Sequence, residues 1–221
     1  MNKGTLYIVS TPIGNLEDMT LRGLRVLKEV DLIAAEDTRR TKILLDKYGI
    51  TKKLISFYSY NSVRKKDEIT DLLKKGKNIA LVSDAGTPGI SDPGFSLIKS
   101  AIENEIPLVQ VPGPVALIAA LVLSGKPTAK FVFEGFLSNK SSKRRARLQS
   151  LAAERRTIIL YESCHRITKL LTDILEVMGN REIAVTRELT KKFEEVKRGK
   201  TSAIRAYFAQ NKPKGEFVVI I

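Results

Sequence analysis

The chain has 221 residues, one cysteine, one histidine and a formal net charge of +14, from 38 Lys and Arg against 24 Asp and Glu. This length supplies enough core for one large or two small domains without disulfides. A single cysteine, Cys164, excludes an internal disulfide and fits a reducing compartment. A Cys/His zinc cluster is excluded as well.

The distribution of apolar and basic residues limits the possible partners. The longest uninterrupted apolar stretch, Val115 to Leu123, is far shorter than the ~20 residues that a membrane-spanning helix needs. We therefore expect a soluble cytoplasmic protein with no membrane partner and no metal. The excess of Lys and Arg favours a polyanionic partner, of which nucleic acid is the obvious class.

The first half of the chain alternates short apolar runs with amphipathic patterns, which is typical of βαβ units and a parallel sheet. We expect strands at 6–9, 32–35, 54–57, 79–82 and 108–111. Helical patterns lie at 21–30, 43–45, 69–73 and 95–102. This half is predicted to form an N-terminal α/β domain, residues 1–114.

The second half has a different pattern, which predicts a mixed or antiparallel sheet. Strands are expected at 131–133, 157–161, 183–186, 193–196 and 217–221, with helices at 143–153, 165–178 and 202–210. The segment 115–123 is apolar all round, as in a helix buried at a domain junction. The fold class is therefore α/β with two domains, the second covering 115–221.

The loop 83–94 follows a buried strand and is rich in Gly and Pro, which suits main-chain contact with a ligand. Asp92 and Pro93 predict the N-cap and first turn of the next helix. The loop contains no Lys or Arg and carries Asp84, unlike a polyphosphate loop. Ribose hydroxyls, an amine or a cationic centre are better ligands for it, although a tight structural turn is the simpler alternative.

Three more strand ends carry candidate functional groups. The first, 10–15, contains Pro12 and Gly14 but lacks the Gly-x-Gly-x-x-Gly pattern of a dinucleotide site. The second, 35–39, places two carboxylates and a guanidinium together, although Asp37 or Thr38 can instead cap the next helix, and for Thr38 capping is favoured. The third, 161–166, contains His165, a candidate base that can also be a helix-terminal residue without chemistry.

Two basic clusters are candidates for RNA contact. The first spans 140–147 without an intervening acid, and the second spans 191–200 and is diluted by Glu194 and Glu195. Solvated helix faces are the competing interpretation of both clusters.

Five ordered motifs together resemble the ribosomal RNA small subunit methyltransferase I family of the tetrapyrrole methylase superfamily. They are Gly4–Asp18, Ala35–Arg39, Ser83–Gly94, Pro112–Pro114 and Tyr161–Arg166. The resemblance implies a homodimeric two-domain enzyme with S-adenosyl-L-methionine bound in the cleft between the domains. It also implies methylation of the ribose 2′-hydroxyl of a cytidine in ribosomal RNA of the small subunit (16S).

The resemblance and the residue chemistry give two sets of site residues. The predicted cofactor-binding residues are Pro12, Gly14, Ser83, Asp84, Ala85, Gly86, Val115, Ala116 and Glu162. The predicted catalytic residues are Glu36, Asp37, Arg39, His165 and Arg166. In the second set, a carboxylate or the imidazole accepts the hydroxyl proton, and the two arginines hold adjacent phosphates.

Two other functions are also compatible with the sequence. C-methylation of a tetrapyrrole shares the fold and cofactor of the superfamily, and a polycarboxylate macrocycle would also bind Arg and Lys. A noncatalytic RNA-binding or ribosome-assembly protein would account for the charge alone. Titration with S-adenosylmethionine separates the enzymes from the binding protein.

Overall fold

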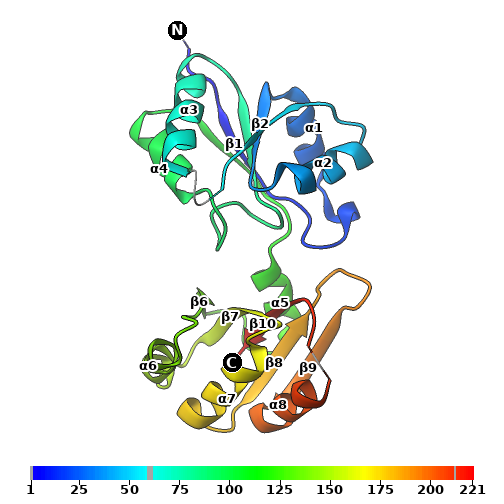
Figure 1. The fold of residues 1–221 in the computed structure, drawn as a ribbon, viewed down its shortest axis with the longest axis vertical. Helices are drawn as coiled ribbons and strands as arrows, with labels where there is room; N and C mark the ends of the chain where they lie inside the picture. Colours follow the sequence, from blue (N-terminus) through cyan, green and yellow to red (C-terminus); the bar gives the residue numbers. More distant parts are fainter. Residues whose placement is uncertain (1, 59–61, 212) are drawn as a thin grey trace. The chain divides into compact units, whose positions relative to one another are not determined.

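The computed structural model describes residues 2–58, 62–211 and 213–221 (Figure 1). The chain divides into two compact units, Met1–Val115 (unit 1) and Ala116–Ile221 (unit 2), each with its own five-stranded sheet. The predicted α/β class is confirmed. Within the described residues, no helix combines the length and apolar character that crossing a membrane requires.

The sheet of unit 1 is parallel throughout, with strand order β3-β2-β4-β1-β5. Its strands are β1 (Leu6–Val9), β2 (Leu32–Ala35), β3 (Lys53–Ser56), β4 (Ile79–Val82) and β5 (Leu108–Val111). Because every strand runs in the same direction, the segments that follow β1, β2, β4 and β5 leave the sheet at one edge. Open α/β sheets bind their ligands at this carboxyl edge.

Helices cover both faces of this sheet (Figure 1). They are α1 (Leu21–Glu29), α2 (Thr38–Lys47), α3 (Ser62–Lys74) and α4 (Phe95–Glu103), after a short 3-10 turn η1 (Leu16–Asp18). Side chains of β2 alternate between two cores: Ile33 and Ala35 pack with α1 and α2, whereas Leu32 and Ala34 pack with α3 and α4. Burial on both faces explains why the inner strands β1, β2 and β4 read as continuous apolar runs.

The sheet of unit 2 is mixed, as predicted, with strand order β6-β7-β10-β8-β9. Its strands are β6 (Phe131–Phe136), β7 (Thr157–Ser163), β8 (Glu182–Arg187), β9 (Glu195–Lys200) and β10 (Glu216–Ile220). Only β6 and β7 pair in parallel, and the other neighbours are antiparallel. The edge strand β9 is exposed or half-buried along its length and carries three basic residues.

Three helices cover one face of this second sheet, and a fourth packs on the other (Figure 1). They are α6 (Ser141–Leu151), α7 (Ile167–Met178) and α8 (Thr201–Gln210), opposite α5 (Ala116–Ser124). The expectation that the all-apolar helix α5 is buried all round is wrong for one of its faces. Leu117, Ala120 and Leu121 are buried, whereas Ile118 and Val122 are exposed.

Two further local predictions are corrected by the structure. Helix α4 begins at Phe95 with Gly94 at its N-cap, so Asp92 and Pro93 precede the helix. Gly94 has φ +148°, a conformation open to glycine that lets the chain enter the helix without the predicted side-chain cap. Phe193 lies in the loop before β9 instead of beginning that strand.

The first basic cluster is largely neutralised inside unit 2. Arg144 is buried and donates from Nε to Asp173 Oδ2 at 2.6 Å, and Arg145 donates to Asp173 Oδ1 at 3.0 Å. Arg147 forms a bidentate pair with Glu134, at 2.6 and 2.7 Å. The three arginines of this cluster therefore join α6 to its neighbours. Their clustering in the sequence does not produce a surface of unpaired arginines here.

The buried pair predicts a specific stability loss. Asp173→Ala leaves the Arg144 guanidinium in the core without its carboxylate, which we expect to lower the free energy of unfolding by about 3–5 kcal/mol. Arg147→Met removes a more exposed pair and should cost no more than about 1 kcal/mol. Urea unfolding of the two variants checks this, and equal losses would contradict the structural role assigned to Asp173.

Candidate functional site

The loops after β1 and β4 are joined by reciprocal hydrogen bonds at the carboxyl edge of unit 1. Thr11 N donates to Gly86 O at 2.8 Å, and Gly86 N donates back to Thr11 O at 3.0 Å. Thr11 Oγ1 also donates to Ser83 O at 3.1 Å, and the hydroxyls of Ser10 and Thr87 lie 2.7 Å apart. The two Gly- and Pro-containing segments singled out in the sequence therefore form one connected structure.

The loop after β5 packs closely against the same two loops. A Cβ added to Gly113 would lie 3.0 Å from Ser10 Cβ, and one added to Gly86 would lie 3.7 Å from Pro114 O. Gly86 has φ +79°, in the left-handed region that strains other residues. The predicted cofactor loops 10–15, 83–94 and 112–114 thus meet at one edge of a single unit.

The loop after β2 is linked to the β4 loop by two bonds between carboxylates and main chain. Asp84 N donates to Glu36 Oε2 at 3.2 Å, and Asp37 N donates to Asp84 Oδ1 at 3.0 Å. Arg40 adds an ion pair with the other Asp84 oxygen at 3.4 Å. Both acids are half-buried, and their positions are fixed by the backbone of the neighbouring loop.

Burial raises the pKa of the Glu36 carboxyl, and the nearby charges of Asp84 and Asp37 raise it further. The hydrogen bond from Asp84 N and the charge of Arg40 act in the opposite direction. A carboxylate with a raised pKa holds a proton more readily than an ordinary glutamate. Glu36 therefore has the electrostatic character expected of a general base.

Asp37 has a different role in the local structure. It is the N-cap of α2, accepting from Arg39 N at 2.9 Å, and it forms a bidentate pair with the Arg39 guanidinium. These hydrogen bonds lower the pKa of Asp37 well below its usual value. The cap is thus Asp37, and the preference for Thr38 is wrong because Thr38 is already the first helical residue.

The remaining predicted cofactor residues of unit 1 lie in or near these loops. Pro12 is buried beside the Thr11 bridge, whereas Gly14 is exposed in the turn that follows. Ala85 is half-buried, and its carbonyl accepts from Ser83 Oγ at 3.3 Å. Val115 is the last residue of unit 1, and Ala116 begins α5 in unit 2.

Apart from Ala116, the predicted site residues of unit 2 lie at the carboxyl end of β7. Glu162 is buried and accepts two hydrogen bonds from Arg166, at 2.7 and 2.9 Å, and one from Ser163 N at 2.8 Å. Arg166 also donates to Leu137 O at 2.9 Å. This pair ties the end of the strand to the helix that follows, and His165 beside it is exposed.

Comparison with known proteins places this chain in a family. Residues 5–205 match the family described as Tetrapyrrole (Corrin/Porphyrin) Methylases. A protein of Thermotoga maritima named "Ribosomal RNA small subunit methyltransferase I" is 51% identical over 99% of this chain and 98% of its own. A Synechocystis sp. protein of the same name is 53% identical over 99% of this chain and 78% of its own.

The chain belongs to the ribosomal RNA small subunit methyltransferase I family of tetrapyrrole methylases. The resemblance found in the sequence is thereby confirmed. A solved structure supports the fold: uroporphyrin-III C-methyl transferase from Thermus thermophilus, complexed with S-adenyl homocysteine, superposes with a TM-score of 0.68. It is 16% identical, and the match covers 98% of this chain and 97% of the other.

Several residues of the candidate site were not singled out from the sequence. Thr11 and Thr87 join the loops, and Arg40 pairs with Asp84. Ser10 and Thr11 come directly after the buried strand β1, and this position at a strand end could have identified them as site residues in the sequence. Among the described residues, no group of three His, Cys, Asp or Glu side chains is arranged to hold a metal ion.

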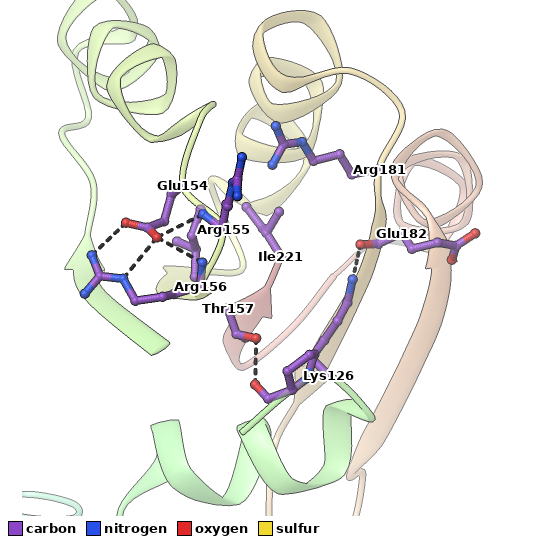
Figure 2. Close-up of a pocket in the computed structure, with 10 residues that line it drawn as sticks. Lys126, Glu154, Arg155, Arg156, Thr157, Arg181, Glu182 and Ile221 are labelled. Atoms are coloured by element: carbon purple, nitrogen blue, oxygen red, sulfur yellow. Dashed lines mark hydrogen bonds and ion pairs between the residues drawn. The ribbon is translucent and has the colours of Figure 1, made fainter. Parts of the chain in front are cut away.

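Unit 2 of the methylase also contains a basic pocket of about 340 Å³ (Figure 2). It lies where β7 and β8 begin, whereas the Glu162–Arg166 pair lies where β7 ends. Arg181 is fixed there by bonds to the carbonyls of Met178 and Ala152. None of the predicted site residues lines this pocket.

The raised pKa of Glu36 predicts a pH-dependent gain in stability on Glu36→Gln. Well below pH 4.5, the ordinary pKa of a glutamate carboxyl, wild type and variant are both uncharged at this position, so their stabilities should agree. As pH rises through 4.5 and then through the higher folded pKa, the wild type loses stability because its half-buried carboxylate ionises. We expect the variant to have the higher Tm at pH 8.

Asp31→Asn is a matched control with the opposite sign. Lys77 and Asn78 N lower the pKa of Asp31, so this carboxylate stabilises the fold above its unfolded value of 3.8. The variant should be less stable than wild type at pH 8, with the difference shrinking as pH falls through the folded pKa. Thermal unfolding from pH 3 to 8 checks both variants, and a pH-independent Glu36→Gln difference would contradict the prediction.

Proposed function

We propose that this protein transfers a methyl group from S-adenosyl-L-methionine to the ribose 2′-hydroxyl of a cytidine in small-subunit ribosomal RNA. The observation that carries the proposal is identity of about half the residues, over almost the whole chain, to relatives named for methylation of this RNA. The proposal places the enzyme in the cytoplasm, as a homodimer acting on the small subunit.

The chemistry of the unit 1 loops supports S-adenosylmethionine as cofactor. They offer main chain and the carboxylate of Asp84, with no Lys or Arg in 83–94. Ribose hydroxyls, an amino group and a sulfonium cation are the complementary groups of this ligand. The Thermus thermophilus methylase, which has this fold, was solved with S-adenyl homocysteine. Pro12, Gly14, Ser83–Gly86, Val115, Ala116 and Glu162 are the residues proposed to hold the cofactor.

Glu36 is the proposed general base. The ribose oxygen attacks the methyl carbon in line, the carbon–sulfur bond breaks with its electron pair going to sulfur, and the hydroxyl proton goes to the carboxylate. Glu36 suits this step because its pKa is raised and its Oε1 atom makes no hydrogen bond to the described residues. Asp37 is occupied as helix cap and partner of Arg39, which makes it a poor proton acceptor.

The charge of unit 2 supports RNA as substrate. This unit contains 21 of the 38 Lys and Arg but only 10 of the 24 Asp and Glu, so it carries +11 of the total +14. A net charge of this size attracts a polyanion even where individual arginines are paired with acids. Arg39 and Arg166, although paired with acids, are proposed to contact phosphates when the substrate binds.

The proposal predicts that Glu36→Gln separates catalysis from binding. Methylation of small subunits should fall by about 10²–10⁴-fold, the range typical of a lost general base. Calorimetric affinity for S-adenosylmethionine should change little, because the amide oxygen can still accept from Asp84 N. Nucleoside mass spectrometry of subunits from cells lacking the gene, incubated with enzyme and cofactor, measures the 2′-O-methylcytidine formed.

Asp37→Asn is the matched control for this experiment. Asparagine caps a helix as well as aspartate does, so this variant should keep methylation within about tenfold of wild type. Full activity of Glu36→Gln would contradict its assignment as base. Incorporation of label into uroporphyrinogen but not into ribosomal subunits would overturn the proposed substrate.

A further inference from the structure

The hairpin loop between β8 and β9, residues 188–194, is held in a strained conformation. Glu188 has φ +50° and Thr190 has φ +64°, both in the left-handed region, and neither is glycine. Such conformations are uncommon for residues other than glycine and persist where the surrounding structure fixes them, often at functional sites. The strain points to a role for the loop beyond connecting two strands.

Hydrogen bonds within the loop and to Glu216 of β10 fix this loop. Glu188 Oε1 accepts from Lys191 Nζ at 2.9 Å and from Glu216 N at 3.0 Å, and Lys191 Nζ also binds Glu216 Oε2 at 2.9 Å. Glu194 Oε2 accepts from Thr190 N at 2.6 Å. Lys191 is thus paired with Glu188 and Glu216, Glu194 holds the backbone of Thr190, and the conformation of the loop is set before any ligand arrives.

The fixed loop presents an aromatic ring and a free cation (the orange segment after β8 in Figure 1). Phe193 is 65% exposed, and Lys192 Nζ lies 5.7 Å from the centre of its ring. Within the described chain, Lys192 forms no ion pair. By contrast, Leu189 in the same loop is buried, so of these two large apolar side chains it is Phe193 that is exposed.

Further along the hairpin, β9 adds positive charge at the edge of the sheet. Arg198 is held by the carbonyl of Leu123, which leaves its charge without an acidic partner in the described structure. An exposed ring with a cation beside it and further positive charge nearby on the same hairpin is a combination by which proteins bind single-stranded nucleic acid: bases stack on the ring, and cations contact phosphates.

We propose that Phe193 is a stacking platform for an unpaired RNA base, with Lys192 contacting a neighbouring phosphate and Arg198 adding positive charge further along the hairpin. This inference rests on the proposed RNA substrate and adds a contact to it outside the methyl-transfer site. Because every base has a stacking face, the platform tolerates any base. Its effect is to hold the single-stranded region of the substrate without reading its sequence.

The test compares RNA with a strand that lacks bases. Two probes are used with the full chain: a fluorescein-labelled 12-nucleotide single-stranded RNA and an abasic ribose–phosphate strand of equal length. Phe193→Ala should weaken RNA binding by about 5- to 100-fold, the range for loss of one stacked base. It should leave binding of the abasic strand unchanged, and Phe193→Trp should restore RNA affinity.

Phe95→Ala is the matched control, because Phe95 is 71% exposed but lies on α4 of unit 1. It should bind both probes as the wild type does. Wild-type RNA affinity in Phe193→Ala would overturn the proposal, and so would an equal loss for both probes. Capture of a protein partner through Phe193, with RNA binding unchanged, would overturn it in favour of a protein-docking role.

The stacking proposal and the proposed function fail in different ways. If the wild type binds the RNA probe through Phe193 but does not methylate small subunits, the platform stands and the assigned reaction fails. If the wild type methylates subunits while Phe193→Ala binds RNA normally, the reaction stands and the platform fails. Thermal unfolding of Phe193→Ala should match wild type, since the ring is largely exposed.

Discussion

A few reciprocal hydrogen bonds between loops fix the candidate site at the carboxyl edge of the unit 1 sheet. Thr11 and Gly86 exchange backbone bonds, and Asp84 is bound to the β2 loop through both its N–H and its carboxylate. Parallel strand pairing brings these loops to one edge, and the reciprocal bonds set their spacing. Any ligand bound by main chain at this edge therefore meets a preorganised surface, which limits the entropy lost on binding.

The charged residues fall into two classes according to their surroundings in the fold. Arg144, Arg147 and Asp37 form ion pairs within the fold, and this stabilising role accounts for their charges. Glu36 is different, because its environment disfavours the ionised form and so destabilises the fold near neutral pH. A destabilising charge at a ligand-binding edge is typical of a functional residue.

The sequence predicted the fold well because its signals were periodic and repeated. Burial on both faces produced apolar runs such as Leu32–Ala35, and a change of pattern near residue 115 marked the second sheet. It failed where the outcome depended on a partner distant in the sequence. Arg144 looked like part of a basic surface until Asp173 was placed beside it, and Phe193 looked like a strand residue until the turn was fixed by Glu216.

The most direct test of the account is to map where the cofactor binds. Amide chemical shifts of isotope-labelled protein, followed during titration with S-adenosylhomocysteine, report the contacted main chain residue by residue. The account predicts the largest changes in 10–15, 35–39, 83–89 and 112–116, and at Glu162. Changes confined to the pocket around Arg155 and Arg181, or no saturable change at all, would contradict the assignment of the carboxyl edge of unit 1 as the cofactor site.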